Sequence, residues 1–177
     1  MARDAGLAVI LSMQWQPQRT RVAPVEQLPH RSALRAWLRL APVFSQDLGV
    51  VFELFNEPAS KPWPAPEVWE EWRSGHQTII DALRGRGVDN TLIVEGIAWG
   101  RLLQGAPELR DPRRRLAWAV HPYFSGDMAA PAMWERHFGV FAQTHPVLVT
   151  EWSHMAEMCK LADASLVVTL FDYLSLI

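Results

Sequence analysis

Five short apolar runs, separated by longer amphipathic stretches, limit what this 177-residue chain can fold into. Each run is continuously apolar rather than alternating, which is typical of a parallel strand buried on both faces. The runs cover residues 7–13, 50–55, 91–94, 116–120 and 147–150. Between them, apolar residues at three- and four-residue spacing predict helices over residues 34–44, 68–83, 134–141 and 166–176.

This alternation predicts an α/β fold built from βαβ units with right-handed crossovers. Two architectures satisfy it, a doubly wound open sheet and a (β/α)8 or TIM barrel. A doubly wound sheet usually has a glycine-rich turn after its first strand, whereas residues 14–17 read QWQP. Residues at the carboxyl ends of several strands converge on one site in a TIM barrel. Polar or aromatic residues stand at such ends here, which favours the barrel: Asn56, Glu57, Trp99, His121 and Glu151.

Composition narrows the class of protein further. With 49% hydrophobic and 20% charged residues the chain is globular, and its length predicts one domain over residues 1–177. A net charge of −2 gives no bulk attraction for nucleic acid or an anionic membrane. The basic run at residues 110–115 is expected to be a solvated loop. The single cysteine, Cys159, excludes an internal disulfide and is expected to be an inert buried thiol.

The sequence has neither a membrane-spanning stretch nor a clear signal peptide. No apolar run reaches the roughly 18 residues of a membrane-spanning helix. The apolar run at residues 7–11 is too short for the core of a signal peptide, so a buried strand explains it better and the localisation stays open. Nine tryptophans beside two tyrosines indicate an aromatic core or a surface that stacks on sugar rings.

Three motifs carry the chemistry. The run at residues 50–55 leads into Asn-Glu-Pro at 56–58, the run at 116–120 into His-Pro-Tyr-Phe at 121–124, and the run at 147–150 into Glu-Trp at 151–152. In this order the motifs closely resemble those of the family 5, cellulase-type glycoside hydrolases, retaining enzymes of the Asn-Glu clan. The resemblance implies a partial TIM barrel that contains about strands 3 to 7.

The resemblance also implies the catalytic pair. Glycosidic cleavage needs one carboxyl group that gives a proton to the departing oxygen and one carboxylate that attacks the anomeric carbon. By resemblance Glu57 is the acid/base and Glu151 the nucleophile of an endo-acting hydrolase of β-1,4-linked glucan. No cofactor is implied, because side chains supply both steps. A metal site built on Glu151 and His154 would have poor geometry at a strand end, so no metal is expected.

Four further residues receive binding roles from the resemblance. Asn56 would hold the sugar 2-hydroxyl, and Tyr123 would hydrogen-bond Glu151. His121 would orient that pair or touch the substrate, and Trp99, ending a strand over residues 91–97, would be an aromatic platform for a neighbouring sugar. Glu53, before the catalytic end of its strand, is expected to be a salt-bridged or polar-layer residue.

The chain does not match the whole family domain. A TIM barrel takes about 250 residues, and the resemblance leaves strands 1, 2 and 8 outside the chain, while Gln14 stands where the family commonly has a histidine. Three hypotheses follow. The chain is an active glycosidase, completed for instance by self-association through exposed strand edges; or a truncated, non-catalytic fragment that binds polysaccharide or oligosaccharide at most; or a metal-dependent hydrolase.

Overall fold

The computed structural model describes residues 2–14, 27–59, 63–124, 130–153, 155–157, 160–161 and 164–177. The expectations for Cys159 and His154, and most of the QWQP segment, lie outside these residues. Within them, no helix is both long enough and apolar enough to cross a bilayer.

Five parallel strands form one sheet in the order β1-β2-β3-β4-β5. They are β1 (Val9–Ser12), β2 (Val50–Glu53), β3 (Leu92–Glu95), β4 (Leu116–Val120) and β5 (Val147–Val149). The predicted strands are confirmed, with ends that differ by at most two residues. Strand order follows chain order throughout, as in a barrel wall, whereas a doubly wound sheet reverses its order at a switch point.

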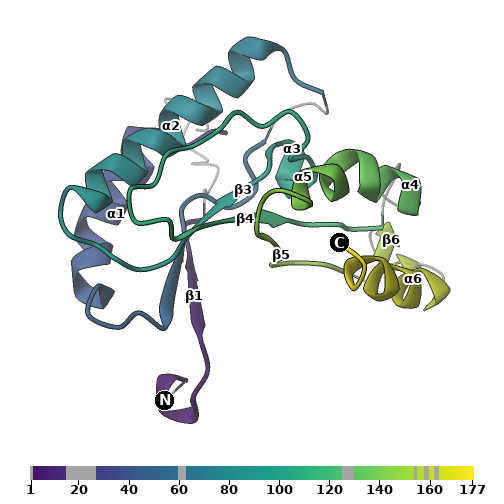
Figure 1. Ribbon diagram of the computed structural model, residues 1–177, viewed down its shortest axis with the longest axis horizontal. Helices are drawn as coiled ribbons and strands as arrows, with labels where there is room; N and C mark the ends of the chain where they lie inside the picture. The colour runs from purple at the N-terminus through teal and green to yellow at the C-terminus, as the bar shows by residue number, and fades with distance from the viewer. Residues whose placement is uncertain are drawn as a thin grey trace.

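Helices connect the strands, and Figure 1 shows the two longest of them side by side on one side of the sheet. After η1 (Arg3–Ala5), the chain forms α1 (Arg31–Phe44), α2 (Pro66–Arg84), the short α3 (Ile97–Gly100), α4 (Pro131–Trp134), η3 (Glu135–Gly139), α5 (Val140–Ala142) and α6 (Ala164–Leu174). A two-stranded antiparallel sheet, β6 (Met155–Glu157) with β7 (Lys160–Leu161), precedes α6. The helix predicted over residues 134–141 is interrupted by η3, which is a π-helix.

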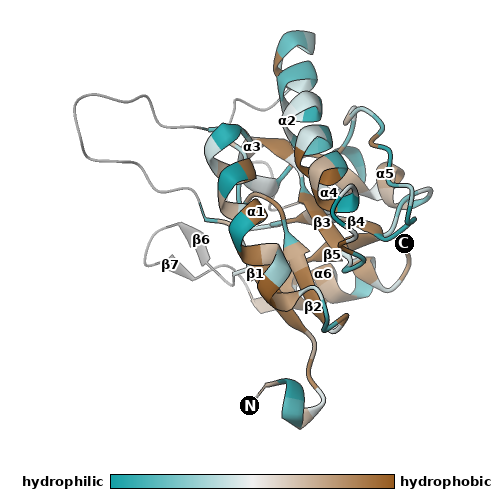
Figure 2. Cartoon of the chain, turned by 90° about the vertical axis from the view of Figure 1, so that its left-hand side faces the viewer, coloured by the Kyte–Doolittle hydropathy of each residue, from teal (hydrophilic) through white to brown (hydrophobic). Residues whose placement is uncertain are grey.

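The main hydrophobic core lies between the sheet and these helices. Side chains of alternate strand residues, such as Phe52, Val94 and Trp118, pack with α1 and α2 in one buried cluster. Two helix tryptophans also tie the layers together by hydrogen bonds. Trp37 Nε1 donates to the carbonyl of Leu54 at 2.8 Å, and Trp72 Nε1 donates to the carbonyl of Glu95 at 3.2 Å. Figure 2 shows the apolar colour concentrated on the strands behind the more polar helices.

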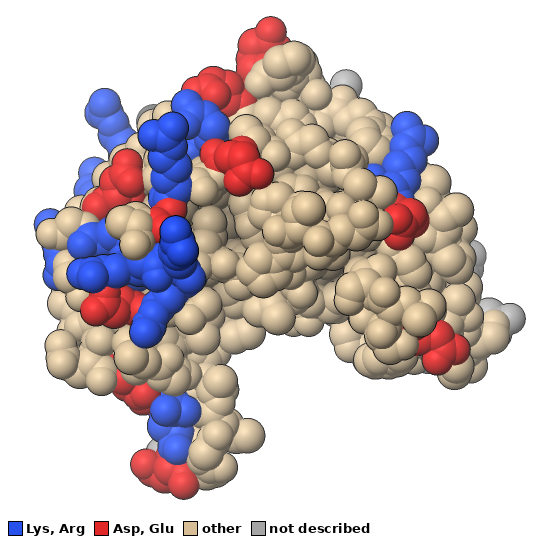
Figure 3. Space-filling view, in the orientation of Figure 1, with Lys and Arg blue, Asp and Glu red and all other residues tan. Residues whose placement is uncertain are grey.

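The opposite face of the sheet is the concave one. Its middle is a small cluster of Ile93, Ala117 and Ala119 with Val51 packed against it. In the space-filling view this side is hollowed between the N-terminal segment and α6, while charged side chains gather on the side of α1 and α2 (Figure 3). The strands therefore form a curled half-barrel with the helices outside, which is a partial (β/α)8 barrel.

The parallel strands end along one edge of the sheet. The segments after β2, β3, β4 and β5 therefore emerge side by side, and these segments carry the residues singled out in the sequence. The basic loop at residues 110–115 lies elsewhere, ahead of β4. Arg113, Arg114 and Arg115 are exposed there, as predicted for a solvated loop.

Candidate active site

The segment after β2 places Asn56 and Glu57. Asn56 is buried, and its Oδ1 has no hydrogen-bond partner among the described residues. Glu57 adopts a left-handed backbone conformation, with φ of 50°, which is uncommon for a residue that is not glycine. Its backbone N–H donates to Oε2 of Glu95 at 2.7 Å. Strained backbone of this kind persists where the surroundings hold it in place, and it clusters at functional sites.

The segment after β5 places Glu151, whose side chain is 39% exposed. Tyr123 Oη donates a hydrogen bond to its Oε2 at 2.7 Å. Carboxylate oxygens of Glu57 and Glu151 and a ring nitrogen of His121 all lie within 4.8 Å of one another. The structure thus brings together side chains that are up to 94 residues apart in the sequence, from Glu57 to Glu151.

His121 is fully buried at the centre of this cluster. Its Nδ1 lies 3.2 Å from Oε1 of Glu57, 3.2 Å from Oε1 of Glu95 and 3.8 Å from Oε2 of Glu151. Its Nε2 lies 3.0 Å from the hydroxyl oxygen of Thr150. The predicted residues Glu57, His121, Tyr123 and Glu151 therefore form one contact network.

Trp99 is placed differently from the expectation. The strand expected to run to residue 97 ends at Glu95, and Trp99 lies in the short α3 that follows. Both Ala98 and Trp99 have φ of 59°, in the left-handed region. The Trp99 backbone N–H donates to the carbonyl of Pro58 at 3.1 Å, and its side chain is 44% exposed. The backbone of Trp99 is therefore joined to the Asn-Glu-Pro segment, and its ring is partly exposed.

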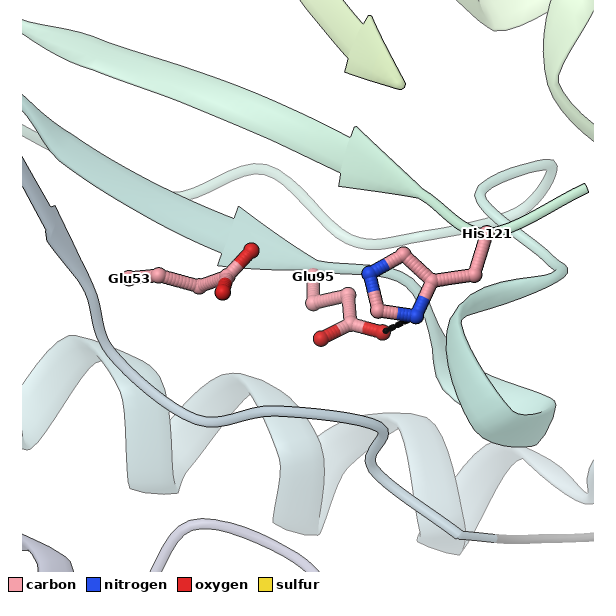
Figure 4. Close-up of side chains that lie close together, drawn as sticks. All are labelled: Glu53, Glu95 and His121. Carbon is pink, nitrogen blue, oxygen red and sulfur yellow. Dashed lines mark ion pairs between the residues drawn. The ribbon is translucent and has the colours of Figure 1, made fainter. Parts of the chain in front are cut away.

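Sequence reasoning missed Glu95, which is fully buried beneath the cluster. Burial raises the pKa of Glu95 well above its ordinary value, and the negative charges of Glu53, Glu57 and Glu151 raise it further, against the lowering effect of the Glu57 N–H. Figure 4 shows Glu53, Glu95 and His121 pointing toward one another. The sequence signal that could have identified Glu95 is its position as a charged residue at the end of an otherwise apolar strand.

Glu53 and Gly100 complete the buried layer. Glu53 is 3% exposed and accepts a 3.1 Å hydrogen bond from the Thr150 hydroxyl, which agrees with its expected place in a polar layer. Gly100 has φ of 73°, and its carbonyl accepts the backbone N–H of His121 at 2.8 Å. A Cβ at this position would overlap Oε1 of Glu95 and lie 2.9 Å from Cγ of His121.

Two sets of side chains in the described part of the chain have metal-binding donor types close together. In each set, one donor atom per residue lies within 4.8 Å of the others: Glu53, Glu95 and His121; and Glu57, His121 and Glu151. Both sets share His121, whose two nitrogens already face hydrogen-bonding groups. The absence of a metal thus stays a prediction.

The fold and the carboxylate-bearing strand ends are those of a (β/α)8 barrel of glycoside hydrolase type. Residues 1–174 match the family described as Cellulase (glycosyl hydrolase family 5), and the chain belongs to that family.

Solved structures with the same fold include family 5 enzymes. A thermostable, halotolerant cellulase from an Icelandic hot spring isolate superposes with a TM-score of 0.76 at 19% identity, over 98% of this chain and 54% of that one. A β-glucanase from Saccharophagus degradans gives 0.74 at 23% identity, over 98% and 57%. A mannanase from Streptomyces sp. SirexAA-E gives 0.69 at 20% identity, over 98% and 55%. The chain thus spans little more than half the length of these proteins.

Proposed function

We propose that this chain carries the catalytic pair of a retaining β-glycosidase acting on β-1,4-linked glucan, with Glu57 as acid/base and Glu151 as nucleophile. The observation that carries the proposal is the approach of the two carboxylates, which have oxygens within 4.8 Å of each other. Retaining glycosidases hold their two carboxyl groups about 5–5.5 Å apart, and inverting enzymes about 6.5–9.5 Å. The short separation favours direct attack by Glu151 over attack by an intervening water.

The reaction has two steps. In the first, a carboxylate oxygen of Glu151 forms a bond to the anomeric carbon while the glycosidic C–O bond breaks, and the Glu57 proton goes to the departing oxygen. In the second, a water oxygen attacks the anomeric carbon, its proton returns to Glu57, and the bond to Glu151 breaks. Tyr123 stabilises the Glu151 carboxylate through its hydrogen bond. Asn56, one residue before Glu57, is the residue proposed to hold the sugar 2-hydroxyl.

The substrate class is supported by the names of the structural relatives. They include cellulases, a β-glucanase and mannanases, and one relative was solved in complex with cellopentaose. A polysaccharide or oligosaccharide of β-1,4-linked sugars is therefore the proposed partner. Two tryptophans could provide stacking surfaces for such a chain, since Trp99 and Trp152 are each more than 40% exposed.

Completion of the barrel belongs to the same proposal. Among the described strands, β1 and β5 each pair with one neighbour, so each has a free edge. Ile10 and Leu148, on these edge strands, are 46% and 44% exposed. Self-association of this single-domain unit through the free edges would cover these side chains and supply further walls of the site.

The second candidate function is carbohydrate binding without hydrolysis. The exposure of Trp99 and Trp152 favours it, since ring faces open to solvent can stack on sugars whether or not the two glutamates react. Such a protein would bind sugar through its exposed tryptophans, and its two glutamates would be inactive.

The deciding experiment is hydrolysis of a soluble β-glucan and an aryl β-cellobioside by the 177-residue chain. Glu57→Gln and Glu151→Gln should each abolish hydrolysis, and NMR should show the β-anomer as the first product. Glu108→Gln is the control, because that glutamate is 77% exposed and lies away from the cluster, beside His145. A folded wild-type chain that binds oligosaccharide without cleaving it would support the second candidate. An α-anomeric first product would contradict the retaining mechanism.

A further inference from the structure

The hydroxyl of Thr150 joins two side chains that come from different strands. Thr150 follows β5, and its hydroxyl donates to Oε1 of Glu53, on β2, at 3.1 Å. The strands β3 and β4 lie between β2 and β5 in the sheet, so this hydrogen bond spans the concave face of the half-barrel. On its other side the hydroxyl oxygen lies 3.0 Å from Nε2 of His121. The residue directly before Glu151 is therefore bonded to two other strand ends.

From these contacts we infer that Thr150 is a positioning residue, whose hydroxyl sets the placement of Glu57 relative to Glu151. It acts through Glu53, which lies on the strand that leads to Glu57, and through His121, whose ring contacts the Glu57 carboxyl group. The inference rests on the proposed function only in that Glu57 and Glu151 are the residues being placed for catalysis.

Both bonds depend on the Thr150 hydroxyl group. It has one hydrogen, which it donates to the Glu53 carboxylate, so its oxygen accepts the hydrogen on Nε2 of His121. Valine has nearly the shape of threonine but can make neither bond. A valine at position 150 would therefore release Glu53 and His121 together.

The His121 ring transmits this contact to Glu57. Nε2 is bonded to Thr150, and Nδ1 lies 3.2 Å from Oε1 of Glu57 in a hydrogen-bond contact. Because the imidazole is rigid and planar, a ring that turns away from Thr150 also changes its contact with Glu57. The ring is fully buried, so solvent has no access with which to replace the Thr150 oxygen.

Glu53 provides the second connection to the acid/base. It lies four residues before Glu57 on the same segment and is 3% exposed. A buried carboxylate needs hydrogen-bond donors, and the Thr150 hydroxyl is the donor to its Oε1. This bond fixes the end of β2 against the segment that carries Glu151, close to where each segment presents its proposed catalytic carboxylate.

The alternative is that the hydroxyl only satisfies a buried carboxylate and so stabilises the fold. The two roles differ in what the loss of the hydroxyl does to the first chemical step. A displaced Glu57 is a poorer acid, and protonation matters most when the departing group is a poor one. Dinitrophenolate departs without a proton, so release of this group requires attack by Glu151 but little help from Glu57.

Hydrolysis of two substrates by the full chain separates these roles, with kcat/KM as the measure of the first step. Thr150→Val should lower kcat/KM for phenyl β-cellobioside by at least about tenfold, and for 2,4-dinitrophenyl β-cellobioside by no more than about threefold. Thr150→Ser keeps the hydroxyl and should stay within about threefold of the wild type on both. Equal losses on the two substrates, or a serine variant as impaired as the valine variant, would overturn the inference.

Thr144→Val is the matched control. The Thr144 hydroxyl oxygen lies 2.9 Å from Nδ1 of His145, and Nε2 of His145 lies 3.1 Å from Oε1 of Glu108. These residues form a second threonine–histidine–glutamate contact, away from the proposed catalytic pair. Thr144→Val should match the wild type on both substrates. A difference between the substrates as large as that in Thr150→Val would also overturn the inference.

Crystal structures of the wild-type chain, Thr150→Val and Thr150→Ser give a readout that does not depend on hydrolysis. The Glu57 carboxyl group should be displaced by about 1 Å or more in the valine variant alone. An unmoved Glu57 would overturn the inference, whereas this displacement in a chain that cleaves neither substrate would contradict the proposed function alone. If Thr150→Val does not fold, Glu53→Gln with Thr150→Val leaves no carboxylate without its donor. The same outcomes then decide, with Glu53→Gln as the reference.

Discussion

The hydroxyl of Tyr123 donates a 2.7 Å hydrogen bond to Oε2 of Glu151, joining the segment after β4 to the segment after β5. Burial raises the pKa of Tyr123 above its ordinary value, and the hydrogen bond to Glu151 raises it further. The phenol therefore keeps its hydrogen at neutral pH and remains a donor to the proposed nucleophile.

Tyr123→Phe is expected to lower kcat by about tenfold or more, because a charge-assisted hydrogen bond to the attacking carboxylate is lost. Hydrolysis of an aryl β-cellobioside measures the effect. The matched control is Tyr173→Phe, since Tyr173 Oη donates a 2.6 Å hydrogen bond to another carboxylate, Glu135, outside the cluster. Equal activity in the two variants would argue against Tyr123 as a catalytic partner of Glu151.

Trp99→Gly should weaken oligosaccharide binding by about tenfold without destabilising the fold. Stacking on the exposed ring is lost, while glycine adopts the left-handed backbone of residue 99 without strain. Titration with cellopentaose and urea unfolding measure the two effects. Trp63→Gly is the control, because Trp63 is also exposed and left-handed, with φ of 55°, but packs beneath the Arg136 guanidinium. Unchanged binding in Trp99→Gly would remove this residue from the proposed site.

The free energy of unfolding should fall as the pH falls from about 6.5 toward 3. Burial lowers the pKa of His76 from 6.5 to about 3 in the folded chain. Between these values the unfolded chain binds a proton that the folded chain does not, so acid favours unfolding, by at most about 1.4 kcal/mol per pH unit from this group. Urea unfolding at several pH values should show a shallower slope in His76→Leu. Thr78→Ala, at an exposed position of the same helix, removes no titratable group and should keep the wild-type slope.

Removal of one partner of the Arg84–Asp111 ion pair should be strongly destabilising. Their side chains are each 3% exposed, and Arg84 also donates to the carbonyls of Val88 and Asn90. Asp111→Ala leaves the guanidinium without its counter-charge, and we expect a loss of about 3–5 kcal/mol in the free energy of unfolding.

The control for this prediction is another arginine–aspartate pair from the same region. Arg113 and Asp89 are about half exposed, and Arg113→Ala should cost no more than about 1 kcal/mol. Similar losses in Asp111→Ala and Arg113→Ala would mean that burial of the Arg84–Asp111 pair does not increase its contribution to the free energy of unfolding.

The strands could be predicted from the sequence because each is a continuous apolar run, and in β2, β3 and β4 the residues on both faces are buried or half-buried. Because the runs are continuously apolar, the sequence does not show which strand residues face the helices. Phe52 packs against Trp37, with ring centroids 5.1 Å apart, while the adjacent Val51 faces the concave side, and nothing in the run separates them. The convergence of His121 and Glu151 could be predicted because parallel strands end along one edge.

The parts that were missed depend on tertiary packing. The left-handed conformations of Glu57 and Trp99 have no local sequence signal, since neither residue is glycine. The role of Glu95 follows from its contacts with Glu57 and His121, which lie on other segments, and its own strand predicts only burial. The π-helix at Glu135–Gly139 likewise lies within residues 134–141, where the spacing of apolar residues predicts an ordinary α-helix.

Substitution of Gly100 depends on which residues occupy positions 95 and 121. Because an added Cβ would meet both Glu95 and His121, position 100 can accept another residue only after one of those two has changed. Its positive φ adds a penalty even then. A library that varies position 100 alone should return glycine, whereas joint variation of positions 95, 100 and 121 would reveal pairs that are tolerated together. We therefore expect these three positions to accept redesign only as a set.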